Sequence, residues 1–147
     1  MNQMANILDI NLDEASKPEV LPGDKAYQVK ISKAMLKTNE QGDPVGITVI
    51  LEAISHPNAE EIIEFLFLPR SEDTESRRRK RLWVIREFVE AFKIPNYKDL
   101  NTWTGRVGTV VLKEEHNDRF GHCNKIASVV APTTGQAPSA PPEKVAP

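Results

Sequence analysis

Cysteine is nearly absent from this 147-residue chain, which contains only Cys123. A lone cysteine excludes an internal disulfide framework and is typical of proteins in a reducing compartment. Long hydrophobic runs are also missing, since no stretch approaches the roughly 20 apolar residues that a membrane-spanning helix needs. The first twenty residues have neither the basic region nor the apolar region of a signal peptide. We therefore expect a cytoplasmic protein.

Groups of side chains that support catalysis are lacking too. The histidines are His56, His116 and His122, and the pair His122–Cys123 has no further spaced partner that could complete a metal site. The sequence contains no glycine-rich phosphate loop and no nucleophile elbow. We therefore expect a protein that is not an enzyme and that holds neither a metal nor a cofactor.

The two ends of the chain differ in composition from its middle. Residues 133–147 are rich in proline, serine, threonine and alanine and have almost no large apolar side chain, which predicts a disordered tail. Residues 1–20 are expected to form an N-terminal arm, in which "ILDINL" is a candidate short pairing segment. Residues 21–132 are long enough to bury the core of one domain.

Hydrophobic periodicity between these ends predicts five strands and one helix. Alternating apolar and polar residues indicate strands at 26–36 and 45–54. Three further stretches also indicate strands: 61–69, which Pro69 closes, and 105–115 and 122–131, which a polar loop joins. Apolar residues at intervals of three and four, from Leu82 to Phe92, indicate a helix that Thr74 or Ser76 would cap and Pro95 would end.

The resulting order, β-β-β-α-β-β, predicts a mainly β protein with an OB-fold, which is a five-stranded Greek-key barrel. A sheet covered by one helix remains the alternative. Closure into a barrel is favoured because five short strands in an open sheet would leave edges exposed.

Charge is arranged in blocks that the overall net charge of −2 hides. Residues 1–24 hold five acids against Lys17, and residues 60–76 hold six acids against Arg70. Residues 77–98 hold eight bases against Glu87 and Glu90. One face of the protein could therefore bind a polyanion while the rest of the molecule stays acidic.

The predicted helix begins with five consecutive cations, Arg77 to Arg81. Positive charge at a helix start opposes the helix dipole and costs helix stability. We therefore interpret this cluster as a surface that binds the phosphates of a nucleic acid. Pairing with the acids just upstream, Glu72, Asp73 and Glu75, is the alternative, although exposed pairs of that kind contribute only about 0–1 kcal/mol each.

Helical geometry assigns different roles to the residues of this helix. With about 100° per residue, the core stripe centres on Leu82, Ile85 and Val89, and Trp83 falls on the opposite side. An outward tryptophan among cations can stack a base while its neighbours hold phosphates. Alternatively, Trp83 packs beneath the N-terminal arm. The cations around Trp83 are Arg79, Lys80 and Arg86, of which Arg79 and Lys80 should matter most; Arg78 and Arg81 flank the stripe and are expected to pack with their stems.

The strands and loops offer a second set of candidates. Nucleic acids bind OB-folds across the second and third strands, between the loop joining strands one and two and the loop joining strands four and five. Lys30, Lys33 and Lys37 follow the first strand, and the loop between the last two strands contributes Arg119, Phe120 and His122. Phe120 is the strongest stacking candidate because its surroundings are polar. Phe65 and Phe67 share a face of the third strand, where we expect them to pack in the core.

The chain also resembles a bacteriophage family long filed as a domain of unknown function. The resemblance runs from Leu21 to Pro132 and rests on "LPGDKAYQVKISKAMLKTNEQGDPVGITVILEAI", "LWVIREFVEAFKIPN" and "LNTWTGRVGTVVLKEEHNDRFGHCNKIASVVAP", with the turn "KTN..G.P" and the closing "NKI". Members are read as phage single-stranded DNA-binding proteins, which implies an OB-fold and non-catalytic binding. This chain ends in "PPEKVAP" and lacks the acidic tip with which many replication single-strand binders recruit partners, which puts such recruitment in doubt.

These observations predict a sequence-tolerant single-stranded DNA-binding protein that acts in phage DNA replication or recombination. Its ligand would be single-stranded DNA, its further partners would be replication or recombination proteins, and its location would be the host cytoplasm, without a membrane. Assembly into a homo-oligomer is left open. The alternative is a non-enzymatic interaction module that docks a recombinase or nuclease through the acidic residues of 60–76.

Overall fold

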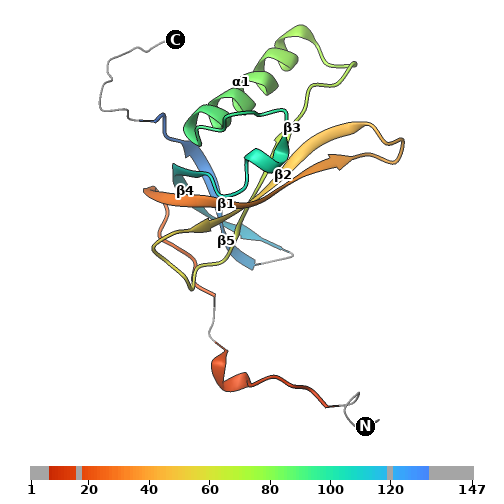
Figure 1. The fold of residues 1–147 in the computed structure, drawn as a ribbon. Coiled ribbons are helices and arrows are strands. Elements are labelled where there is room, and N and C mark those ends of the chain that lie inside the picture. Colours follow the sequence, from red (N-terminus) through yellow and green to blue (C-terminus); the bar gives the residue numbers. More distant parts are fainter. Residues whose placement is uncertain (1–6, 16–17, 119–120, 133–147) are drawn as a thin grey trace.

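In the computed structural model, the described part of the chain forms five antiparallel strands in one open sheet and a single α-helix (Figure 1). The structure describes residues 7–15, 18–118 and 121–132. The strands are β1 (Lys25–Thr38), β2 (Pro44–Ala53), β3 (Ile62–Phe67), β4 (Val107–Asn117) and β5 (Gly121–Val129), and helix α1 (Glu75–Ala91) follows β3. Short 3-10 turns occur at η2 (Leu12–Glu14) and η3 (Leu100–Thr102). The mainly β class and the predicted strands and helix are confirmed.

The sheet has the order β3-β2-β1-β4-β5, with β1 in the middle. Strand β1 pairs with β4 over residues 25–30 and with β2 over residues 29–38. It can serve both neighbours because it is 14 residues long and contains a bulge between Ile31 and Lys33. Strands β3 and β5 are the two edges. They approach each other, since the Lys125 Nζ donates to the Ile63 carbonyl over 3.4 Å.

The core lies between the inner face of the sheet and the C-terminal half of α1. Aromatic side chains fill it: the Phe88 ring stacks on those of Phe92 and Trp103, with centroids 4.5 and 5.8 Å apart. Gly108 of β4 lies against the Phe92 ring, where a Cβ would come within 2.9 Å. The absence of a side chain at this position lets the end of the helix pack closely on the sheet.

The core-facing stripe of α1 differs from the predicted one. Phe88 and Ala91 are buried, whereas Leu82, expected near the centre of the stripe, is 44% exposed. The prediction was wrong because only the second half of α1 packs on the sheet, while its first turns project beyond it (Figure 1). Arg81 is half-buried as expected, but Arg78 is exposed. Thr74 caps the helix, since its Oγ1 accepts from the backbone N–H of Arg77 over 3.1 Å.

Among the described residues of the N-terminal segment, those from Glu19 onward join the fold. Glu19 forms a parallel bridge with Ala59, and the buried Leu21 exchanges hydrogen bonds of 2.8 and 2.9 Å with the side chain of Asn124. The stretch "ILDINL" does not pair with the sheet as predicted, because residues 7–12 belong to no strand and their apolar side chains are exposed. The predicted disordered tail, 133–147, lies outside the described residues. In the part of the chain that the structure describes, no helix is long and apolar enough to cross a membrane.

Candidate nucleic-acid interface

Two phenylalanines of β3 point away from the core. Successive side chains of a strand face opposite sides of the sheet, and Ile62 and Leu66 are buried on the inner side. Phe65 and Phe67 therefore face outward, and Phe67 is 57% exposed. The prediction that they pack in the core is wrong for Phe67, while Phe65 is half-buried.

The strand register brings two lysines of β1 onto the same outer face. Lys37 pairs with Gly46 of β2, which in turn pairs with Phe67 of β3. Lys33 lies two rows further along the same face, in register with Ile50 and, beyond it, Ile63. Since strands lie about 4.8 Å apart, each lysine stem starts about 10 Å from the β3 side of this surface. We call the outward surface of β1, β2 and β3 the outer sheet face.

Gly46 determines how the aromatic rings lie on this face. A Cβ at Gly46 would overlap the Phe65 ring, so the glycine leaves room for that ring to lie over β2. The Phe67 ring meets the Phe65 ring edge to face, with centroids 4.8 Å apart and planes at 79°. The two rings form one aromatic surface at the end of β3.

The start of α1 completes a groove beside these rings. The groove has a volume of about 330 Å³ and is lined by Val45, Phe65, Phe67, Arg70, Glu72, Asp73, Arg77 and Arg81. The Arg81 guanidinium lies 5.5 Å from the centre of the Phe67 ring and is held by Asp73 over 3.0 Å and by the Leu68 carbonyl over 3.3 Å. These contacts tie the helix start to the aromatic pair.

The cations around the outer sheet face differ in how far they are neutralised. Arg81 is paired with Asp73, and Arg70 lies 3.8 Å from Glu72. Lys33, Lys37 and Arg77 are exposed, and within the described residues none of them forms an ion pair. These three side chains are therefore available to an anionic ligand.

The predicted cluster around Trp83 lies on another side of the helix. Residues 77 and 81 face the groove, whereas Arg79, Trp83 and Arg86 fall on the opposite side of the helix. Trp83 is 56% exposed with the Arg86 guanidinium 5.9 Å from its ring, so the alternative of burial beneath the arm does not occur in the described residues. Arg79 pairs with Glu75 over 3.4 Å and Arg86 with Glu90 over 3.0 Å; Lys80 is exposed.

The remaining predicted residues are spread over the sheet. Lys30 is exposed and in register with Glu52, which places an acid beside it. His122 is exposed at the start of β5, with its Nε2 2.9 Å from a carboxylate oxygen of Glu114. The predictions for Arg119 and Phe120 fall outside the described residues.

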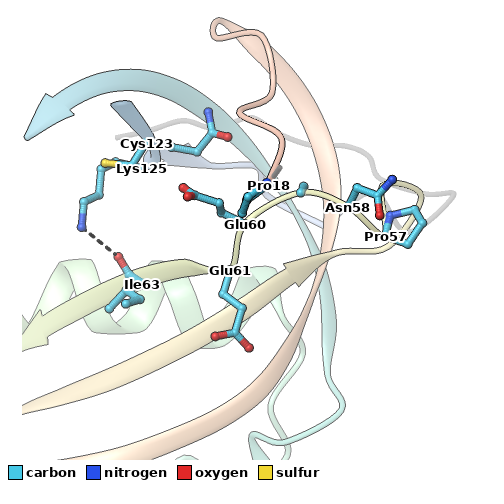
Figure 2. Close-up of a pocket in the computed structure, with 10 residues that line it drawn as sticks. Pro18, Pro57, Asn58, Glu60, Glu61, Ile63, Cys123 and Lys125 are labelled. Atoms are coloured by element: carbon cyan, nitrogen blue, oxygen red, sulfur yellow. Dashed lines mark hydrogen bonds between the residues drawn. The ribbon is translucent and has the colours of Figure 1, made fainter. Parts of the chain in front are cut away.

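A larger cavity lies at the seam between β3 and β5, with a volume of about 700 Å³ (Figure 2). Its lining includes Glu60, Glu61 and Lys125 but no aromatic side chain, so it offers little to a nucleic acid. Glu64 lies on the inner side of β3, where burial raises the pKa of its carboxyl although Lys125 and Lys113 act in the opposite direction. Within the described residues no group of three or more histidine, cysteine, aspartate and glutamate side chains could hold a metal ion.

Sequence patterns did not predict the places of Phe67 and Arg70 in the groove. The stretch "EIIEFLFLP" is apolar at almost every position, so its periodicity cannot tell which face of β3 is buried. Arg70 stands alone among acids and gave no signal of its own. The alternation of β2 could have helped, because Gly46 interrupts its outer row and marks a place where a neighbouring side chain lies close.

Comparison with known proteins assigns no family to this chain. No protein-family model matches it, and no curated protein does. The resemblance to phage single-strand binders stays a prediction.

Proposed function

We propose that the protein is a sequence-tolerant single-stranded DNA-binding protein and that the outer sheet face holds the DNA. The observation that carries this proposal is the combination of two outward phenylalanine rings with three cations that form no ion pair with any described residue, on one continuous surface. Aromatic stacking and phosphate neutralisation are the two contributions from which single-strand binders derive affinity.

The roles of the residues follow from their chemistry. A base stacks on Phe67, the more exposed ring, while Phe65 supports that ring from the side. Lys33 and Lys37 on one flank and Arg77 on the other neutralise phosphates. Since every base has a flat face, this surface accepts any sequence.

We further propose that the sheet is an OB-fold barrel that closes at the seam between β3 and β5. The spatial order β4-β1-β2-β3 supports this proposal, because three successive strands followed by a fourth that returns beside the first is the pattern of a Greek key. The contact from Lys125 to Ile63 across the seam supports it as well (Figure 2). The outer sheet face then corresponds to the surface that OB-folds use for oligonucleotides.

The biological setting that we propose is phage DNA replication or recombination in the host cytoplasm. Exposed single strands arise in both processes, and a binder without sequence preference protects them. The acidic residues 60–76 could serve as a docking segment for a recombinase or nuclease, but Arg70 and Asp73 of that segment line the groove of the outer sheet face. This overlap favours DNA binding over the alternative.

Competition between nucleic acids tests the proposal. The protein is bound to a labelled single-stranded oligonucleotide, and unlabelled single-stranded DNA, duplex DNA and single-stranded RNA are added in turn. We expect single strands of unrelated sequence to compete equally well and duplex DNA to compete poorly, because the stacked bases of a duplex cannot reach Phe67. Equal or better competition by the duplex would contradict the proposal.

A further inference from the structure

Two apolar surfaces of this chain lie uncovered, and we propose that each binds the other in a second copy of the chain. One is the arm segment 7–14, and the other is a groove on α1 lined by Leu82, Ile85, Arg86, Val89, Glu90 and Tyr97. The arm of one copy lies in the α1 groove of its neighbour. The proposal does not depend on DNA binding, because the outer sheet face contributes to neither surface.

The arm segment presents apolar side chains in a pattern that suits a docking strand. Leu8, Ile10 and Leu12 alternate with polar residues and are between 66% and 80% exposed. In an extended segment such residues share one side and span about 13 Å from the first to the last. The Asn11 side chain accepts from the Asp13 backbone N–H over 3.0 Å and starts the turn that ends the segment. A row of large exposed apolar side chains is typical of an interaction surface.

The groove on α1 matches this row in length and chemistry. It has a volume of about 410 Å³, and its apolar lining comes mainly from Leu82, Ile85 and Val89, with Tyr97 also lining it. The three helical residues follow the spacing of one helix face and extend over about 10.5 Å along the axis. The row on the arm and the stripe on the helix are therefore of similar length.

Charge complements the apolar match. The arm segment carries Asp9, Asp13 and Glu14 and no base. Arg78 is exposed and lies in line with the apolar stripe of the helix, and no described residue forms an ion pair with it. Arg79 and Arg86 lie on one side of the stripe and are paired with Glu75 and Glu90. An arm that lies in the groove brings its acids next to Arg78, whereas the contact of one arm with another arm would bring acids together.

The path of the chain directs the arm to a neighbour. The arm is fastened to the sheet at Glu19 and Leu21, where Leu21 bonds to Asn124. Residues 7–15 lie at the end of the molecule opposite α1 (Figure 1). The arm segment therefore lies far from the α1 groove of its own chain, and the occupant that we assign to the groove is the arm of a second copy.

Sedimentation equilibrium of the full chain without DNA tests the exchange. We expect the average mass of the wild type to rise above 16.5 kDa as its concentration increases through the micromolar range. The arm variant Leu8→Asp with Leu12→Asp and the groove variant Leu82→Asp should each remain monomeric. Ile54→Asp, which replaces a similarly exposed apolar residue elsewhere, should assemble like the wild type.

Mixing the two variants gives the decisive result. The arm variant retains an intact groove and the groove variant an intact arm, so the mixture should form a 1:1 complex although each component alone is monomeric. The milder change Leu82→Ser should weaken assembly in the same direction with an unaltered melting temperature. A wild type that stays monomeric, variants that assemble like the wild type, or a mixture that stays monomeric would each overturn the proposal.

Discussion

Phe67 combines two properties that seldom occur together in a strand residue: a large aromatic side chain and a mostly exposed surface. It lies at the end of β3, where the Phe65 ring supports one side and the Arg81 guanidinium lies 5.5 Å from its centre. Since Asp73 holds Arg81 in place, the ring stays oriented in the absence of a ligand. A preoriented ring loses little conformational entropy when a base stacks on it.

Replacing this ring should weaken DNA binding without unfolding the protein. We expect Phe67→Ala to reduce the binding free energy for single-stranded DNA by about 1–3 kcal/mol, the range for one stacked base. Because the side chain is exposed, the melting temperature should change little. Titration of a labelled oligonucleotide at fixed salt measures the loss. Trp83→Ala removes an equally exposed aromatic from the other side of α1 and should leave affinity unchanged. Equal losses in both variants would contradict the assignment.

Sequence alone could identify the kinds of residue in the site but not all of their positions. Alternation with Val29 and Ile31 places Lys30 outward, but by the same period it would place Lys33 and Lys37 inward. The bulge between Ile31 and Lys33 shifts the alternation and brings both lysines to the outer face. The roles of Phe65 and Phe67 could not be predicted, because apolar residues occupy both faces of β3 and only the pairing with β2 decides which face is buried. Helical geometry placed Trp83 correctly on the outward side of α1. It misplaced Leu82 in the core, because the apolar spacing continues through the whole helix while only its second half packs on the sheet.

At the scale of elements, β3 and β5 are the two edge strands of the sheet, and they approach each other without pairing as neighbouring strands. These two edge strands meet through a lysine side chain and border the large cavity (Figure 2). Glu64 faces this region from the inner side of β3, and burial raises the pKa of its carboxyl. A carboxyl with a raised pKa disfavours folding once it ionises, because the unfolded chain holds the charge more easily.

Glu64→Gln should therefore stabilise the protein in a pH-dependent way. Below the ordinary pKa of about 4.5, Glu64 is protonated in both states, so variant and wild type should melt at similar temperatures. As the pH rises through the elevated pKa, the wild type loses stability and the amide does not. Melting curves from pH 4 to pH 8 should show a gain for the variant that grows toward neutral pH. A gain that is constant with pH, or a less stable variant at pH 8, would contradict this account.

The elements themselves could largely be predicted from the sequence. Alternation indicated β1 and β2, an apolar run closed by Pro69 indicated β3, and helical spacing with Thr74 as a cap indicated α1. Strands β4 and β5 could be predicted as apolar stretches on either side of a polar loop. The arm was harder, since "ILDINL" has the composition of a strand but no partner strand within its own fold. The pairing of Glu19 with Ala59 depends on the tertiary structure and has no local signal.

At the scale of the whole molecule, charge is segregated between surfaces. Within the described residues, Lys33, Lys37 and Arg77 are exposed and form no ion pair on the outer sheet face and at the start of α1. The arm segment 7–14 carries three acids and no base. Such segregation lets a chain of net charge −2 attract a polyanion to one side. It also leaves two basic surfaces on α1, of which only the one with Arg77 and Arg81 adjoins the aromatic pair.

The salt dependence of single-stranded DNA binding distinguishes most directly between the outer sheet face and the side of α1 that carries Arg79 and Lys80. Two variants each remove two positive charges: Lys33→Ala with Lys37→Ala on the outer sheet face, and Arg79→Ala with Lys80→Ala on α1. If the outer sheet face holds the DNA, the first variant should bind more weakly, and its plot of log affinity against log salt should be shallower by about 1.4, at about 0.7 for each lost phosphate contact. The second variant should match the wild type in both respects. A wild-type slope in the lysine variant, or a shallower slope only in the α1 variant, would contradict the account.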